Sequence, residues 1–119
     1  MTILTADAQE NHELFVQRVR ETGLVWGLES DKGWAVCESA EYEDALVYPF
    51  WSDETFARPH CVDEWSGYRA ASIPLDRFLD EWLPGMDEDD ALVGTNWDAE
   101  LTGVELEPGD LAGQLVDED

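Results

Sequence analysis

The surplus of acidic side chains constrains this sequence more than any other feature. Among its 119 residues are 29 Asp and Glu but 6 Lys and Arg, which gives a formal net charge of −23 at pH 7. Self-repulsion on this scale opposes collapse of the chain. A fold must therefore bury a large apolar core and spread its carboxylates over the surface.

The apolar content is sufficient for such a core. Hydrophobic residues make up 44% of the sequence and include 6 Trp, 4 Phe and 3 Tyr. Each aromatic side chain buries roughly 150–250 Å², and a chain of this length buries about two-thirds of its unfolded surface. We expect a single domain over residues 1–116 with a Trp-rich core, followed by a frayed acidic C-terminus at residues 117–119.

The charge and the absence of long apolar runs exclude several roles. Phosphate contacts need Lys and Arg, so direct binding to nucleic acid or to an anionic membrane surface is not expected. No apolar run approaches the ~18 residues of a membrane span. The N-terminus has no basic, apolar export signal, which predicts a cytoplasmic protein. There, Cys37 and Cys61 are expected to be half-buried free thiols, although their spacing leaves a bridge open.

Helical patterns occupy four stretches. Residues 7–22 carry an N-cap at Asp7 and end before Gly23. A second helix starts at Ser52-Asp53-Glu54, and Pro59 should kink or split it. A third opens at Ser72-Ile73-Pro74-Leu75 and should stop at Pro84-Gly85. The last is a short helix over residues 108–116.

Strand patterns lie between these helices. Residues 24–28 and 34–37 form a predicted hairpin, and residues 91–97 and 101–106 form a second around a turn at 98–100. Residues 45–51 read as a strand in which Pro49 marks an edge or the end of a ladder. Residues 68–73 form another short strand. The order predicts an α+β domain: a mostly antiparallel sheet of about five to six short strands with three to four helices packed on it.

Several short motifs, weak singly, form an ordered series. They are Val25-Trp26-Gly27-Leu28, Gly33-Trp34, Pro49-Phe50-Trp51-Ser52 with Ala57, Cys61 to Trp65, Ile73-Pro74-Leu75 with Phe78 and Trp82-Leu83, Val93-Gly94 with Trp97, and Glu107-Pro108. In this order and spacing, residues 11–116 resemble the small bacterial domain-of-unknown-function family 2750. The resemblance implies no established activity and carries over no catalytic residue. The acidity exceeds what the family needs, which favours an origin in the host's conditions.

Catalytic, metal and cofactor motifs are not found. His12, His60, Cys37 and Cys61 lack the spacing of a zinc site. His60 and Cys61 are neighbours in sequence, and catalytic Cys/His pairs meet in space instead. No nucleophile elbow, dinucleotide fingerprint or phosphate-binding loop is present. We therefore expect no catalytic residue, no metal and no cofactor, although any two of the 29 carboxylates could form an unrecognised site.

The candidate binding residues are aromatic or acidic. Trp26, Trp34, Trp82 and Trp97 lie in periodic segments and are expected in the core. Trp51 and Trp65 flank the second predicted helix, where they either rim a groove or form its two buried ends. The acidic run at residues 87–90 is either a patch or a solvated loop. The partner-binding candidates are Trp51, Asp53, Glu54, Trp65, Asp87, Glu88, Asp89 and Asp90.

These features favour a non-enzymatic cytosolic domain that binds a basic protein partner through an acidic, aromatic-rimmed face. An immunity or inhibitor protein for a basic target belongs to this class. The alternatives are a salt-adapted acidic housekeeping protein, a mimic of the DNA backbone with two rows of carboxylates, and an enzyme with an unrecognised carboxylate site. The oligomeric state is left open.

Overall fold

The structure is a computed structural model that describes residues 7–31, 33–39, 45–61, 65–97 and 103–115. Its first helix, α1 (Ala8–Thr22), has the predicted caps. Asp7 accepts hydrogen bonds from the backbone N–H groups of Gln9 and Glu10, at 3.0 and 3.2 Å. Gly23 ends the helix in the left-handed region at φ 75°, which glycine adopts without a steric penalty.

The first sheet is antiparallel. Its order is β2-β1-β5, with β1 at Leu24–Ser30, β2 at Gly33–Trp34 and β5 at Arg69–Pro74. The predicted hairpin is confirmed where β2 pairs with β1. The rest of the predicted second strand does not join this hairpin, because β3 (Cys37–Glu38) pairs with a strand of the other sheet.

The second sheet is mixed, and this corrects the predicted single, mostly antiparallel sheet. Its order is β3-β4-β6-β7, with β4 at Leu46–Phe50, β6 at Leu92–Thr95 and β7 at Val104–Leu106. β4 and β6 run parallel, while the other pairs are antiparallel. The described chain therefore has seven strands in two sheets, and its class is α+β as predicted. The predicted turn at residues 98–100 lies outside the described residues.

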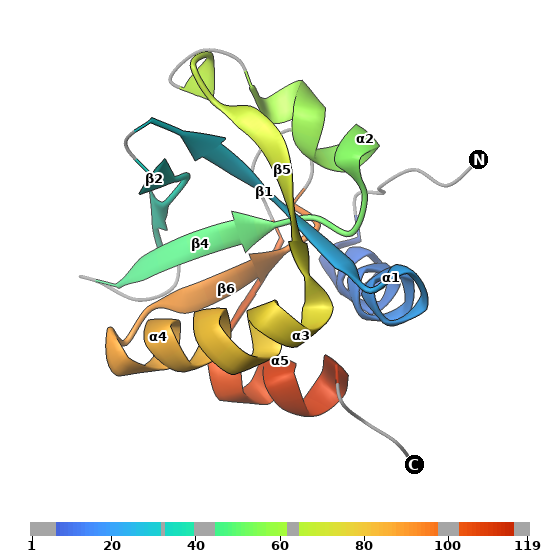
Figure 1. Ribbon diagram of the computed structural model, residues 1–119. Helices are drawn as coiled ribbons and strands as arrows, with labels where there is room; N and C mark the ends of the chain where they lie inside the picture. The colour runs from blue at the N-terminus through green and yellow to red at the C-terminus, as the bar shows by residue number, and fades with distance from the viewer. Residues whose placement is uncertain (1–6, 32, 40–44, 62–64, 98–102, 116–119) are drawn as a thin grey trace.

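Two tryptophans join the sheets. The backbone N–H of Trp26 in β1 donates to the carbonyl of Trp51, just after β4, at 2.8 Å, and Trp51 N–H donates back at 2.7 Å. Figure 1 shows β1 crossing the carboxyl end of β4 at this point. The two sheets thus share one continuous hydrogen-bonded junction.

Pro49 lies inside the second sheet, so the expectation of an edge strand is wrong. β3 pairs with β4 only at Leu46 and Val47, and β1 reaches β4 only at Trp51. In a strand, the backbone N–H positions of residues i and i+2 face the same edge, so those of Pro49 and Trp51 face the same edge of β4. Pro49 has no N–H to donate, but the ladder between β3 and β4 has already ended at this position, so no ladder hydrogen bond is lost. The second alternative of the prediction, in which Pro49 marks the end of a ladder, is therefore the one that holds.

Two helical segments follow β4 and β5. Pro59 splits the first, as predicted, into α2 (Glu54–Ala57) and the 3₁₀ turn η1 (Arg58–His60). The second runs without interruption through α3 (Leu75–Arg77), the π-helical η3 (Phe78–Trp82) and α4 (Leu83–Glu88).

The predicted stop at Pro84-Gly85 is therefore wrong. In a regular α-helix, Pro84 would clash with the carbonyl four residues earlier. Here Leu83 N–H donates to the Phe78 carbonyl five residues back, which widens the turn. Pro84 then falls in the first turn of α4, where a missing N–H is tolerated.

The remaining helix, α5 (Pro108–Leu115), matches its prediction and buries Leu111 and Leu115. Figure 1 places α4 and α5 along one side of β4 and β6, with α1 beyond the carboxyl ends of these strands. None of the helices in the described part of the chain has both the length and the apolar character that a membrane span needs.

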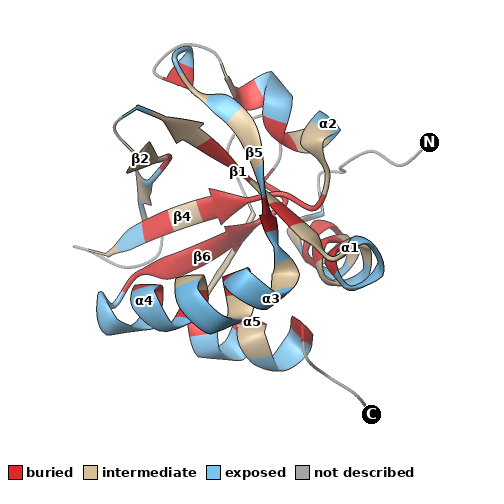
Figure 2. Ribbon diagram, in the orientation of Figure 1, coloured by how far each residue is buried: buried red, intermediate tan, exposed pale blue. Residues whose placement is uncertain are grey.

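The core has two parts, one on each side of β4. Val47 and Trp51 belong to the part that contains Trp65 and Trp97, while Phe50 belongs to the part lined by α1, α4 and α5. Because β4 is covered on both faces, its sequence is a continuous apolar run rather than an alternating one. Figure 2 shows β4 and β6 mostly buried and the helices buried on one side.

The predicted core role of four tryptophans holds to different degrees. Trp97 is 3% exposed, whereas Trp26, Trp34 and Trp82 are half-buried and pack against the two core parts. Trp34 and Trp82 meet edge to face, with ring centroids 4.7 Å apart.

Glycine is required where Trp97 folds back onto β6, because a Cβ on Gly94 would lie 2.5 Å from Trp97 Cε2. The indole N–H also donates to the Val104 carbonyl at 3.2 Å, so the ring is held in place. We predict that Gly94→Ala lowers the free energy of unfolding by about 1–3 kcal/mol, measured by urea denaturation.

The control is Gly113→Ala in α5, where an added Cβ meets nothing within 4 Å. It should raise stability by about 0.5–1 kcal/mol, because alanine restricts the unfolded chain and favours the helix. Equal effects of the two substitutions would contradict the close packing of Trp97.

Candidate functional site

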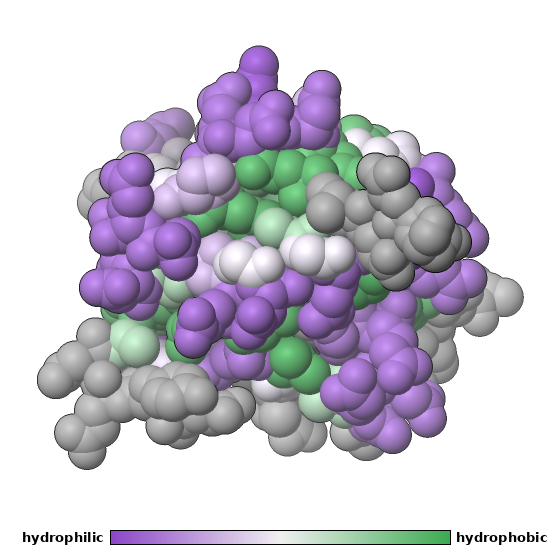
Figure 3. All heavy atoms as spheres, turned by 90° about the horizontal axis from the view of Figure 1, so that it is seen from below, coloured by the Kyte–Doolittle hydropathy of each residue, from purple (hydrophilic) through white to green (hydrophobic). Residues whose placement is uncertain are grey.

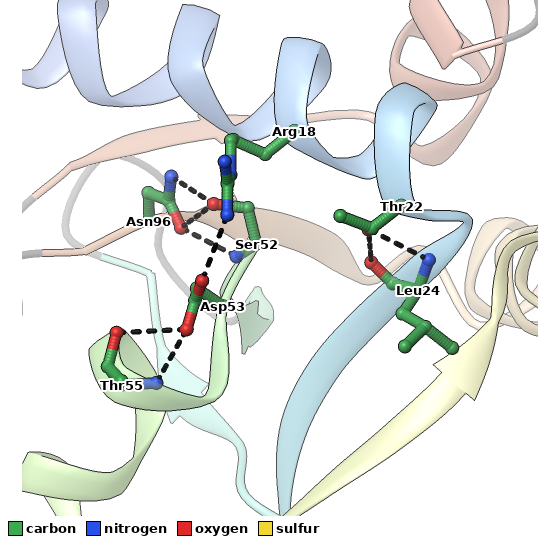
Figure 4. Close-up of polar contacts among 7 residues, drawn as sticks. All are labelled: Arg18, Thr22, Leu24, Ser52, Asp53, Thr55 and Asn96. Atoms are coloured by element: carbon green, nitrogen blue, oxygen red, sulfur yellow. Dashed lines mark hydrogen bonds and ion pairs between the residues drawn. The ribbon is translucent and has the colours of Figure 1, made fainter. Parts of the chain in front are cut away.

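A buried polar cluster lies at the carboxyl ends of the parallel strands β4 and β6. Asn96, just after β6, is fully buried and has φ 47°. Its Oδ1 accepts the backbone N–H of Ser52 at 2.8 Å (Figure 4). Its Nδ2 donates to the Asn11 carbonyl at 3.1 Å. One side chain therefore ties the ends of both strands to α1.

His12 extends this cluster to α5. Its Nδ1 lies 2.8 Å from Thr95 Oγ1, and its Nε2 lies 2.7 Å from Gln114 Oε1. The imidazole is 5% exposed and Thr95 is fully buried. The first turns of α1, the end of β6 and the end of α5 are thus held at fixed positions around one histidine.

An open groove lies beside His12, with α1 and α5 as its walls and β7 as its floor. Its volume is about 990 Å³, at the upper end of the range for ligand pockets. The lining includes the apolar side chains Val16, Val104 and Leu106, and the carboxylates Glu13, Glu21 and Asp110. Arg20 also lines it, near the end of α1. We call this hollow the α1–α5 groove.

A smaller hollow adjoins the groove on the other side of β7. Its volume is about 360 Å³, and Ala45, Leu92 and Leu106 form its apolar part. Four carboxylates also line it: Asp90, Glu105, Glu107 and Asp110. We call it the β7 hollow. In Figure 3, the face of the molecule that carries α4 and α5 shows apolar side chains in a band between hydrophilic ones.

The two predicted rim tryptophans lie in the interior, so the expected aromatic rim does not form. Trp51 is 0% and Trp65 is 6% exposed. The Trp51 indole N–H donates to the Trp97 carbonyl at 3.0 Å. Trp51 follows a strand that is covered on both faces, and burial of its large ring contributes to the core, as the alternative interpretation of the sequence stated.

Asp53 and Glu54 have structural contacts at the start of α2. Asp53 caps the helix through Thr55 N–H at 2.9 Å and pairs with Arg18 at 3.2 Å (Figure 4). Glu54 forms an ion pair with Arg58 one turn later. The Thr55 N–H bond lowers the pKa of Asp53 most. Partial burial opposes it, and the Thr55 hydroxyl and Arg18 lower the pKa further.

The acidic run at residues 87–90 is exposed at the end of α4. Asp90 has φ 58° and lines the β7 hollow, whereas Asp87, Glu88 and Asp89 line neither hollow. In Figure 1 this end of α4 and the start of α2 lie on opposite sides of the molecule. The structure therefore does not bring Asp53 and Glu54 together with this run.

The histidines and cysteines are dispersed. His12 belongs to the cluster at the strand ends, while His60 stacks on Trp51 with ring centroids 4.8 Å apart. Cys37 and Cys61 are half-buried and form no disulfide, as expected. Burial raises the pKa of the Cys61 thiol, against the opposing effect of Arg58. A nucleophilic thiolate needs the reverse shift.

Sequence reasoning did not find the α1–α5 groove. One wall follows the helical stripe of Gln9, Glu13, Val16 and Arg20, which α1 presents on one side. The other wall and the floor come from residues 104–114, about ninety positions later. The stripe was visible in the sequence, but nothing local indicates that α5 and β7 lie opposite it.

The structure is that of a small α+β protein with an open, acid-lined groove. A family model described as protein of unknown function (DUF2750) matches residues 12–115. The chain belongs to this family, as the resemblance in the sequence indicated. No curated protein matches the sequence.

Asp53 gives a pH-dependent test of the α2 cap. We predict that Asp53→Ala lowers the free energy of unfolding at neutral pH by about 1 kcal/mol, because an N-cap side chain is lost. The folded-state pKa of Asp53 is lowered, so its contribution is complete above the unfolded value near 3.9 and is lost as pH falls through the folded value. The difference in the free energy of unfolding between Asp53→Ala and the native protein, measured by urea denaturation, should therefore decrease below about pH 4.

Asp53→Asn is the control, since asparagine caps a helix as well as aspartate but does not titrate. The difference in the free energy of unfolding between Asp53→Asn and Asp53→Ala should be the same at neutral pH and at about pH 3. A native-to-alanine difference that stays constant over this range would show that the carboxylate of Asp53 does not stabilise the fold through its charge.

Proposed function

We propose that this protein is a non-enzymatic, cytosolic binding domain that recognises a basic protein partner through the α1–α5 groove. The observation that carries the proposal is the composition of the groove: an apolar floor of Val104 and Leu106 between walls that bear Glu13, Glu21 and Asp110. Lysine and arginine have an apolar stem and a charged head. Such a side chain fits with its stem on this floor and its head against a wall carboxylate.

The charge balance supports a basic partner. If each of the 6 bases paired with one acid, 23 of the 29 acids would still have no base within the chain. Ion pairs within the chain join Arg18 with Asp53, Arg58 with Glu54, Arg69 with Glu29 and Arg77 with Glu81. The remaining negative field attracts a basic protein and speeds encounter.

An inhibitor or immunity role is one form of this function. A small acidic domain that covers the basic site of a toxin or enzyme needs a rigid recognition surface and no chemistry of its own. The groove walls meet this need, because Asn96 and His12 hold α1 against the ends of β6 and α5. This rigidity limits the entropy lost when a partner binds.

Salt adaptation is a second candidate, and the exposed acids outside the groove favour it. Asp87, Glu88 and Asp89 line neither hollow and project at the end of α4. On this account the carboxylates bind water and cations, and the protein loses stability at low salt through self-repulsion. It predicts no preference for acids in the groove over acids elsewhere.

The two candidates predict different results when acids inside and outside the groove are neutralised. The probe is a fluorescein-labelled peptide of alternating Lys and Leu, followed by anisotropy at about 0.15 M salt. We expect saturable binding, and we expect Glu13→Gln with Asp110→Asn to weaken it about three- to tenfold, from two exposed charge contacts. The control, Asp87→Asn with Glu88→Gln, changes the net charge equally outside the groove and should change affinity less than twofold.

Equal weakening by both double variants would show that the charge acts at a distance, as salt adaptation predicts. Absence of saturable binding by the native protein would contradict the proposed function. Circular dichroism of each variant checks that the fold is retained.

A further inference from the structure

We propose that the α1–α5 groove and the β7 hollow form one track that takes an extended segment of the partner with cationic side chains along its length. This inference rests on the proposed function and adds the shape and the charge pattern of the ligand. Its occupant is a basic peptide segment of a partner protein, held without secondary structure of its own.

The adjacency of the two hollows is the first observation. Leu106 of β7 and Asp110 of α5 line both of them. The hollows therefore adjoin at these two side chains, with the carboxylate of Asp110 at the junction. A segment that lies in the groove reaches the β7 hollow by crossing these two side chains.

The length of the groove sets the length of the segment. Along α1 its lining runs from Gln9 to Glu21, a distance of about 18 Å at 1.5 Å per residue. An extended chain rises about 3.3 Å per residue, so about five extended residues span the groove. A segment that continues past Asp110 into the β7 hollow is longer than this.

The charges fix where the cations of the segment lie. Arg20 lines the groove near the end of α1 and disfavours a cation there. Beyond the junction, the described residues that line the β7 hollow include acids and no base, and Asp90 and Glu107 are exposed. Glu105 is held by the Ser39 hydroxyl, which donates to its Oε1 at 2.6 Å. Charge complementarity therefore places one cation at Asp110 and another in the β7 hollow.

Peptide length separates this track from simple groove binding. Two labelled peptides of alternating Lys and Leu are used, one of about five residues and one of about eight. We expect Asp90→Asn with Glu107→Gln to weaken the longer peptide about three- to tenfold and to leave the shorter one within twofold. Asparagine tolerates the positive φ of position 90, so the turn is retained.

Asp87→Asn with Glu88→Gln is again the matched control and should leave both peptides within twofold. One outcome overturns the track but leaves the proposed function standing. In it, the affinity for the longer peptide is unchanged by Asp90→Asn with Glu107→Gln but is lowered by Glu13→Gln with Asp110→Asn. If every variant weakens both peptides equally, or neither peptide binds the native protein, the track and the proposed function both fail.

Discussion

The parallel pairing of β4 with β6 is the constraint on which the rest of the structure depends, and Asn96 secures its carboxyl end. The Asn96 amide bonds the backbone of Ser52 after β4 and the backbone of Asn11 in α1. Each buried backbone group left without a partner costs about 1–3 kcal/mol. Because the same side chain holds α1, the wall of the α1–α5 groove depends on the junction of the two strands. The wall of the candidate binding surface is therefore held in place by buried hydrogen bonds.

Local signals in the sequence were sufficient for local structure. Asp7 and Gly23 define the ends of α1, and Pro59 splits the segment after β4, because caps and proline act on their own turns. Long-range pairing was not predictable in this way. β4 and β6 are separated by α2, β5 and the helix from Leu75 to Glu88, so no hairpin signal indicates that they run side by side. The π-helical turn before Pro84 likewise overrides a proline rule that is usually reliable.

The candidate site could not be predicted for the same reason, because it also depends on long-range contacts. The sequence singles out acidic residues and tryptophans, but burial decides their roles: Trp51 and Trp65 form core, and Asp53 caps a helix. Of the acidic run, Asp90 lines the β7 hollow, whereas residues 87–89 line neither this hollow nor the α1–α5 groove. The groove arises from helix α1 and from β7 and α5, which meet only in the folded chain. Under the proposed function, the charge of −23 favours a basic partner, and the fold indicates where its cations would lie against apolar surface.

Amide chemical-shift mapping tests the central claim most directly. The isotope-labelled protein is titrated with the Lys/Leu peptide while the backbone amides of all assigned residues are followed. We predict saturable shifts concentrated in the exposed side of α1, in β7 and at the start of α5, while residues 87–89 at the end of α4 are unaffected. Shifts spread over all acidic segments, or centred on residues 87–89, would contradict a groove that selects its ligand by shape as well as by charge.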